Sequence, residues 1–203
     1  MRTWIRYALF LGMVISLVAC RAPQPWHEPF DSADDWQLSS DASARLDIAD
    51  GVLSIHVLLP GQIAWASADR TYRDFRLTVE ATQVAGPDDN EYGVLVRMDG
   101  NKRFYAFSIS GDGYARAARY DAGTWVLLGS DWTPSDAIHQ GEATNVLTIE
   151  AIGRDFTFFV NGAQVLQVED RAAARGDIGL YAGAFGEGGV VIAFDNLEIE
   201  PLP

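Results

Sequence analysis

The chain has 203 residues but only one cysteine, Cys20, and this scarcity limits how the fold can be stabilised. Exported proteins often use disulfides, but here no second cysteine is available to pair with the first. The three histidines, His27, His56 and His139, have no spacing typical of metal ligands. The sequence therefore excludes a disulfide framework and gives no histidine motif for a metal centre.

Basic residues are also scarce. Lys and Arg together number 15 against 28 Asp and Glu, which gives a net charge of −13. Residues 1–19 contain Arg2 and Arg6 and no acid, so the rest of the chain has 13 basic and 28 acidic residues, a net charge of −15. Such a negative field repels nucleic acid and anionic lipid surfaces. We therefore exclude nucleic-acid binding and a polybasic membrane patch.

The apolar run near the N-terminus is too short to span a membrane. Residues 7–19 are 13 uncharged residues that follow Arg2 and Arg6, whereas a bilayer-spanning helix needs about 20 apolar residues. A positive start followed by an apolar segment of this length is typical of a signal peptide. We therefore predict a signal peptide over residues 1–19 and an exported protein.

The apolar run ends in Leu17-Val18-Ala19-Cys20, which resembles the bacterial lipobox. The resemblance implies cleavage before Cys20 and attachment of the thiol to a diacylglycerol, so that the lipid bilayer of the cell envelope is one partner. The alternative is ordinary signal cleavage that leaves a free thiol. Residues 20–35, interrupted by three prolines, are predicted to form the lipidated cysteine and a short tether, and residues 36–203 a single domain.

From residue 36 onward, short alternating segments are separated by turn residues. Apolar side chains at Phe75, Leu77 and Val79 alternate with polar ones, which predicts strands with one buried face. The clearest hairpin is residues 156–168 around Asn161-Gly162, because Asn-Gly adopts positive φ at little energetic cost. No long helical pattern is present. The sequence predicts an all-β fold, a two-sheet antiparallel β-sandwich of the jelly-roll type.

Several segments, in this order, resemble the concanavalin A-like lectin/glucanase superfamily, specifically its laminin G-like and 3-keto-disaccharide-hydrolase-like bacterial members. The matching segments are residues 72–79, 92–97, 103–109, 145–149, 158–162, 176–181 and 194–199. The likeness covers about residues 30–199 and implies a concanavalin A-like jelly roll. The superfamily includes lectins, glycosidases and adhesion modules, so the fold alone does not determine the function.

The sequence contains no recognisable catalytic motif. Retaining glycosidases of the superfamily place two carboxylates in a Glu-x-Asp-x-x-Glu strand, because a nucleophile and an acid must lie about 5 Å apart. Neither this motif nor Gly-x-Ser-x-Gly is found here. These absences favour a protein that is not an enzyme, but they leave open a site assembled from distant strands.

Candidate ligand-binding residues lie on strands whose other face is predicted to be core. If Val94 and Val96 point inward, Arg97 points outward, and the same alternation places Phe104 and Ser108 outside. The superfamily often binds sugars on one sheet, and this implies a glycan-binding face with these candidates: Arg97, Phe104, Ser108, Tyr114, Arg116 and Trp125. The alternative is that the aromatic residues belong to the core and that the arginines form solvated ion pairs.

A calcium site is a further expectation from the resemblance, with Asp195 on the last strand as a ligand, since calcium prefers carboxylate and carbonyl oxygens. Alternatively, Asp195 bonds to backbone at a strand bend. Residues 88–91 form a second acidic cluster, which we interpret as a solvated loop.

Three functions fit these observations. The first is a surface-anchored lipoprotein whose sandwich binds carbohydrate without cleaving it. The second is a structural envelope lipoprotein that interacts with another protein. The third is a glycan-cleaving hydrolase whose site has no recognisable motif.

Overall fold

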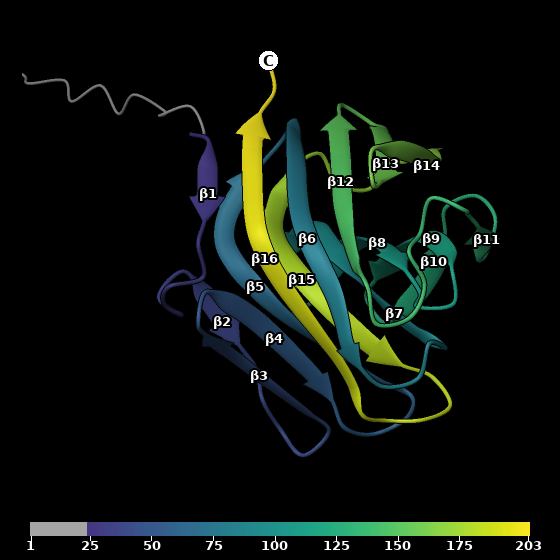
Figure 1. Ribbon diagram of the computed structural model, residues 1–203. Coiled ribbons are helices and arrows are strands. Elements are labelled where there is room, and N and C mark those ends of the chain that lie inside the picture. Colours follow the sequence, from purple (N-terminus) through teal and green to yellow (C-terminus); the bar gives the residue numbers. More distant parts are fainter. Residues whose placement is uncertain (1–23) are drawn as a thin grey trace, which may run out of the picture.

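The computed structural model describes residues 24–203, which form a β-sandwich without helices (Figure 1). Its strands are β1 (Trp26–Glu28), β2 (Trp36–Leu38), β3 (Ala44–Ala49), β4 (Val52–Val57), β5 (Gln62–Tyr72), β6 (Phe75–Ala85), β7 (Asn90–Asp99), β8 (Arg103–Ile109), β9 (Tyr114–Asp121), β10 (Thr124–Leu127), β11 (Thr133–Pro134), β12 (Thr144–Ile152), β13 (Asp155–Val160), β14 (Ala163–Glu169), β15 (Gly176–Ala184) and β16 (Val190–Pro201). Among these residues no helix is long and apolar enough to cross a membrane. The predicted all-β fold is confirmed.

Two sheets of eight strands make up the sandwich. In the first, sheet A, the order is β14-β13-β12-β6-β16-β4-β3, with β1 also paired to β16. In the second, sheet B, the order is β10-β9-β8-β7-β15-β5-β2, with β11 paired to β9. Every pairing is antiparallel. This architecture is the two-sheet antiparallel sandwich expected from the strand pattern.

The core lies between the sheets. On sheet A, Leu77 and Val79 of β6 are fully buried, as the period-two pattern predicted. On sheet B, Tyr105 and Phe107 of β8 point inward and contact the ring of Phe156 on β13, with centroid distances of 4.6 and 5.5 Å. Burial of each large apolar side chain contributes about 1.5–3 kcal/mol, so this interface supplies most of the stability.

Hairpin turns follow the predicted chemistry. Asn161 and Gly162 have φ values of 51° and 82°, and they join β13 to β14. Asp50 and Gly51 have φ values of 53° and 78°, and they join β3 to β4. Two successive residues with positive φ match the twist of antiparallel strands. The predicted hairpin of residues 156–168 is therefore present.

The sandwich begins earlier than residue 36, where the sequence placed its boundary. Trp26 and Phe30 are buried and their rings pack on Trp36, with centroid distances of 5.8 and 5.6 Å. The buried Glu28 carboxylate accepts hydrogen bonds from the Phe30 N–H at 2.7 Å and the Trp36 indole N–H at 3.1 Å. The prolines at 25 and 29 flank β1 rather than interrupt it, as is usual for proline near strands. Residues 24–35 therefore belong to the domain and not to a tether.

Arg97 is buried, which contradicts its predicted outward position. A bulge interrupts the β7–β8 register after Val96, and Arg97 has a φ of 52°, so the alternation of sides breaks at this residue. The side chain is 0% exposed and lies over the Phe156 ring at 4.7 Å. Its guanidinium donates hydrogen bonds to the carbonyls of Arg73, Gly153 and Ala173, at 2.9, 2.7 and 3.1 Å. Arg97 therefore joins three loops at one end of the sandwich, and its guanidinium is not presented to solvent.

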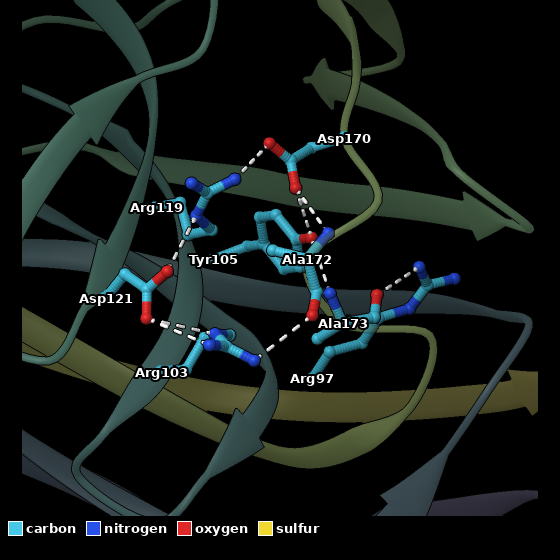
Figure 2. A network of polar contacts seen from close by, with 8 residues as sticks. All are labelled: Arg97, Arg103, Tyr105, Arg119, Asp121, Asp170, Ala172 and Ala173. Carbon is cyan, nitrogen blue, oxygen red and sulfur yellow. Dashed lines mark hydrogen bonds and ion pairs between the residues drawn. The ribbon is translucent and has the colours of Figure 1, made fainter.

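A polar network extends from Arg97 across this end of the molecule (Figure 2). The Asp170 carboxylate accepts hydrogen bonds from the Tyr105 hydroxyl and the Ala172 N–H, both at 2.7 Å. It also forms an ion pair with Arg119. Arg103 donates to Asp121 and to the Ala172 carbonyl. These bonds hold the loop between β14 and β15 against β8 and β9.

Replacement of Asp170 by Asn should therefore destabilise the fold. Burial alone raises the pKa of Asp170, but hydrogen bonds from Ala172, Tyr105 and Arg119 outweigh it, so the pKa is lowered. A lowered carboxyl pKa adds stability above the unfolded value of about 3.9, and this stability is lost as pH falls through the folded pKa. We expect Asp170→Asn to lower the free energy of unfolding by about 2–3 kcal/mol at pH 7.

Urea unfolding of both proteins at pH 7 and at pH 3 measures this effect. The difference between the two proteins should shrink at the lower pH, because Asp170 in the unfolded wild-type chain, with a pKa of about 3.9, then takes up protons while the folded carboxylate has a lower pKa. A difference that is constant with pH would show that the charge of Asp170 contributes nothing. Glu169→Gln is a matched control, since its carboxylate pairs with Arg154 at the surface and is 62% exposed; we expect a change below about 1 kcal/mol.

Candidate functional site

The outer face of sheet B differs from that of sheet A. On sheet A, the solvent-facing pairs are polar, such as Thr82 with Thr144 and Arg76 with Glu150. On sheet B, a second and smaller apolar cluster lies outside the main core; its buried members are Leu95, Met98, Phe104, Ala106 and Tyr181. The outer face of sheet B therefore carries a layer of apolar and aromatic side chains.

Two of the predicted ligand residues, Phe104 and Trp125, lie in this outer cluster. Phe104 is 2% exposed because two rings cover it. The Tyr120 ring stacks on it with a centroid distance of 5.0 Å, and the Trp125 ring forms a T-shaped contact with it at 5.7 Å. Trp125 is 39% exposed. Phe104 thus faces outward as predicted but is covered, and only Trp125 of the two presents surface to solvent.

Ser108 and Arg116 lie side by side in one cross-strand row. The register pairs Arg116 with Ser108, Ser108 with Gly93, and Gly93 with Tyr181, so four neighbouring strands contribute to the row. Ser108 is buried and its hydroxyl lies beside that of Tyr181. The structure therefore brings these two predicted residues together, although Ser108 is not accessible.

A buried ion pair lies beside this row. Arg116 and the Glu91 carboxylate are 2.6 Å apart, and the Tyr181 hydroxyl donates to the same carboxylate at 3.4 Å. Burial raises the pKa of the Glu91 carboxyl, and Arg116 partly offsets this effect. Burial and the neighbouring Glu91 raise the pKa of Tyr181 well above its usual value, so its hydroxyl stays protonated. The Arg116 charge is thus largely satisfied within the protein.

Arg116 also positions Trp132. Its guanidinium lies over the Trp132 ring at 4.5 Å, and the ring of Phe185 meets Trp132 at 6.0 Å in an edge contact. Trp132 lies in the irregular segment between β10 and β11, so its backbone is not part of a strand. A cation against an aromatic face is attractive, so Arg116 helps to fix this side chain.

These residues border a recess of about 240 Å³, which we call the Trp132 recess. It is lined by Asp89, Ser110, Asp112, Tyr114, Trp132 and Phe185. The Ser110 hydroxyl donates to the Asp112 carboxylate, and Tyr114 is 38% exposed. Aromatic walls with a few polar groups are typical of a small-molecule site.

The sequence identified only part of the recess. Tyr114 was predicted and lies in its wall, and Arg116 was predicted and lies behind Trp132. Asp89, Ser110, Asp112 and Phe185, which also line the recess, were not predicted as site residues. The acidic cluster of residues 88–91 was a signal, since Asp89 lines the recess and Glu91 pairs with Arg116.

Asp195 pairs with Glu80 of β6, and the β16–β6 register shifts directly after it. Its carboxylate accepts a hydrogen bond from the Asn196 N–H at 2.6 Å, and Asn196 has a φ of 51°. Within residues 24–203, no group of three or more His, Cys, Asp or Glu side chains is placed to hold a metal ion. This arrangement corresponds to the alternative of a carboxylate that stabilises a strand bend.

β1 and the last residues of β15 lie at opposite ends of the sandwich (Figure 1). The Gln24 carbonyl accepts a hydrogen bond from Tyr72, which pairs with Gly176 at the start of β15. Phe185 of the recess follows the last residue of β15. A strand of nine residues spans about 26 Å, so this distance separates the two ends. Cys20, the predicted lipidation site, lies outside the described residues.

Comparison with known proteins identifies the family. A family model described as the 3-keto-alpha-glucoside-1,2-lyase-like domain matches residues 25–200. The chain belongs to this family. The match starts before β1 and ends in β16, so it covers the whole sandwich, including the residues first assigned to a tether. A comparison with curated proteins gives no match.

Solved structures share the fold of this family member at low sequence identity. The carbohydrate binding module CBM66 from Bacillus subtilis has a TM-score of 0.66 and 15% identity, over 82% of this chain and 95% of that one. A β-1,3-1,4-glucanase (lichenase) from a mouse hindgut metagenome has a TM-score of 0.67 and 12% identity, over 88% of this chain and all of that one. The neighbours include a binding module and an enzyme, and they establish a concanavalin A-like β-sandwich.

Proposed function

We propose that the protein is an exported lipoprotein of the bacterial cell envelope whose sandwich binds carbohydrate without cleaving it. The observation that supports this most is the Trp132 recess, where three aromatic side chains stand beside two carboxylates and a hydroxyl. Aromatic rings pack against the CH faces of sugars, and oxygen acceptors bind their hydroxyls. Family membership and the CBM66 fold are consistent with this role.

Binding of the full-length chain to a glycan array, in detergent, tests this function. We expect selective binding of a small set of oligosaccharides, reversed by the free sugar. Chelator should leave the binding unchanged if no calcium takes part. If no glycan binds under either condition, carbohydrate binding is wrong, and an envelope protein becomes the expected partner.

The anchor places the recess outward. Cys20 is four residues before Gln24, and Gln24 lies at the end of the sandwich away from the recess. A domain held by lipid at Cys20 thus presents the recess away from the bilayer. Each buried CH₂ of the lipid contributes about 0.8 kcal/mol, so several acyl chains hold the domain at the surface.

Metabolic labelling with a fatty acid tests the anchor. We expect label in the wild-type chain and none in Cys20→Ser, because the thiol is the atom that carries the lipid. Ser16→Ala, a change in the same segment that keeps the thiol, should retain the label. An unlabelled wild-type chain would exclude lipidation and favour ordinary signal cleavage.

A second candidate function is cleavage of a 3-keto glucoside, as in the description of the family. The specific observation in its favour is that two carboxylates, Asp89 and Asp112, line the same recess, since paired carboxylates suit acid–base chemistry. Incubation of the full-length chain with a 3-keto disaccharide, followed by detection of released sugar, tests it. Turnover that is lost in Asp89→Asn/Asp112→Asn would replace the binding function by an enzymatic one.

A further inference from the structure

The loops around the Trp132 recess carry charged residues of one sign only. The loops next to it, residues 86–89, 110–113, 128–143 and 185–189, contain seven Asp or Glu and no Lys or Arg. Two of these acids, Asp89 and Asp112, line the recess itself. Arg116 is the basic residue that contacts the recess, since its guanidinium lies on the Trp132 ring. Its charge is paired with the Glu91 carboxylate at 2.6 Å. A ligand in the recess therefore meets negative charge.

One of the lining carboxylates has no partner within residues 24–203. The Asp89 side chain is exposed and makes no hydrogen bond or ion pair with any residue from 24 to 203. Asp112 accepts one hydrogen bond, from Ser110. Both carboxylates thus have acceptor capacity left for a ligand, since an ionised carboxylate offers about four acceptor sites.

The aromatic walls add to the same preference. Trp132, Tyr114 and Phe185 surround the recess, and aromatic rings attract cations through their negative faces. Trp132 already contacts one cation, the Arg116 guanidinium. A recess lined by one sign of charge also raises the local concentration of ligands of opposite sign. Both effects act against an acidic sugar and in favour of a basic one.

We propose that the Trp132 recess selects sugars that carry a protonated amine over neutral and acidic sugars. The inference rests on the proposed carbohydrate-binding function and names its ligand class. Ammonium groups donate hydrogen bonds to Asp89 and Asp112, while the ring carbons lie against the aromatic walls. Uronic acids and sulfated sugars are repelled by the same carboxylates.

Titration of the full-length chain with three oligomers of equal length tests the proposal: glucosamine, N-acetylglucosamine and glucuronate. We expect the glucosamine oligomer to bind at least tenfold more tightly than the acetylated one, and the glucuronate oligomer to show no binding. The glucosamine affinity should fall when salt is raised from about 0.05 to 0.5 M, because salt screens exposed charges.

Asp89→Asn/Asp112→Asn should weaken glucosamine binding roughly tenfold, because each exposed carboxylate contributes about three- to fivefold. Binding of a neutral oligomer should weaken less, by no more than about threefold, because the amide oxygens at both positions still accept hydrogen bonds from hydroxyls. Asp136→Asn/Glu142→Gln is the matched control, since it removes the same charge from an adjacent loop without altering the lining; we expect less than a twofold change.

Each result separates the inference from the proposed function. Equal or tighter binding of the acetylated oligomer, or an equal loss in the control pair, would overturn the selection of amines by the recess and leave carbohydrate binding intact. Failure of every oligosaccharide, on the array and in titration, would overturn both.

Discussion

Arg97→Met should lower the free energy of unfolding by about 3–5 kcal/mol, the largest stability effect expected in this protein. The Arg97 guanidinium is the donor to the carbonyls of Arg73, Gly153 and Ala173 and also faces Asp74 at 3.4 Å. Methionine fills much of the volume over Phe156 but donates nothing, so several buried acceptors lose their partner. Urea unfolding monitored by tryptophan fluorescence measures the loss.

Arg97→Lys provides the comparison. Lysine keeps the charge but has a single nitrogen in place of the planar guanidinium, so it can donate to fewer of the three loops. We expect a loss of unfolding free energy between that of Arg97→Met and zero. Glycan binding by this folded variant should remain within about twofold of wild type. Arg97 belongs to the polar network of Figure 2, next to the start of β15, whereas Phe185 of the recess follows the last residue of β15. A loss below about 1 kcal/mol in Arg97→Met, or selective loss of binding in Arg97→Lys, would contradict the structural role.

Trp132→Ala should reduce glycan affinity by about 30-fold, the largest effect expected on binding. Removal of a central aromatic anchor costs about 2 kcal/mol or more in binding sites of this kind, and 1.4 kcal/mol corresponds to a factor of ten. The change also removes the ring on which Arg116 and Phe185 pack. Calorimetric titration with an oligosaccharide selected from the array gives the dissociation constant.

Trp125→Ala is the matched control for this prediction. Trp125 lies on the same outer face and is 39% exposed, but it belongs to the cluster around Phe104 and Tyr120 and does not line the recess. We expect its affinity to stay within about threefold of wild type. A greater loss in Trp125→Ala than in Trp132→Ala would move the binding site to the outer cluster.

Most of the fold could be predicted because its signals are local. Alternation along β6 identified its buried face, and Asn161-Gly162 identified a hairpin, since both depend on neighbouring residues only. The start of the domain was placed too late because three prolines suggested a tether. The short β1 between Pro25 and Pro29 is stabilised by distant contacts to β16 and Trp36, which have no local signal.

The candidate site was only partly predictable, for two physical reasons. Alternation cannot reveal a bulge, so the side on which Arg97 lies was assigned wrongly. The recess is assembled from four segments that are far apart in the sequence, at Asp89, at residues 110–114, at Trp132 and at Phe185. Of the lining residues, Tyr114 is the one that lies on a predicted strand with an outward face. The acidic residues of the recess lie in loops, where acidic residues are common.

A crystal structure of the chain with a bound oligosaccharide tests the central claim most directly. The account predicts a sugar ring in the Trp132 recess, in contact with the Trp132 or Tyr114 ring, with a polar group of the sugar within hydrogen-bond distance of Asp89 or Asp112. A sugar bound at the end of the sandwich near Gln24, or against Trp125 with the recess free of sugar, would contradict it.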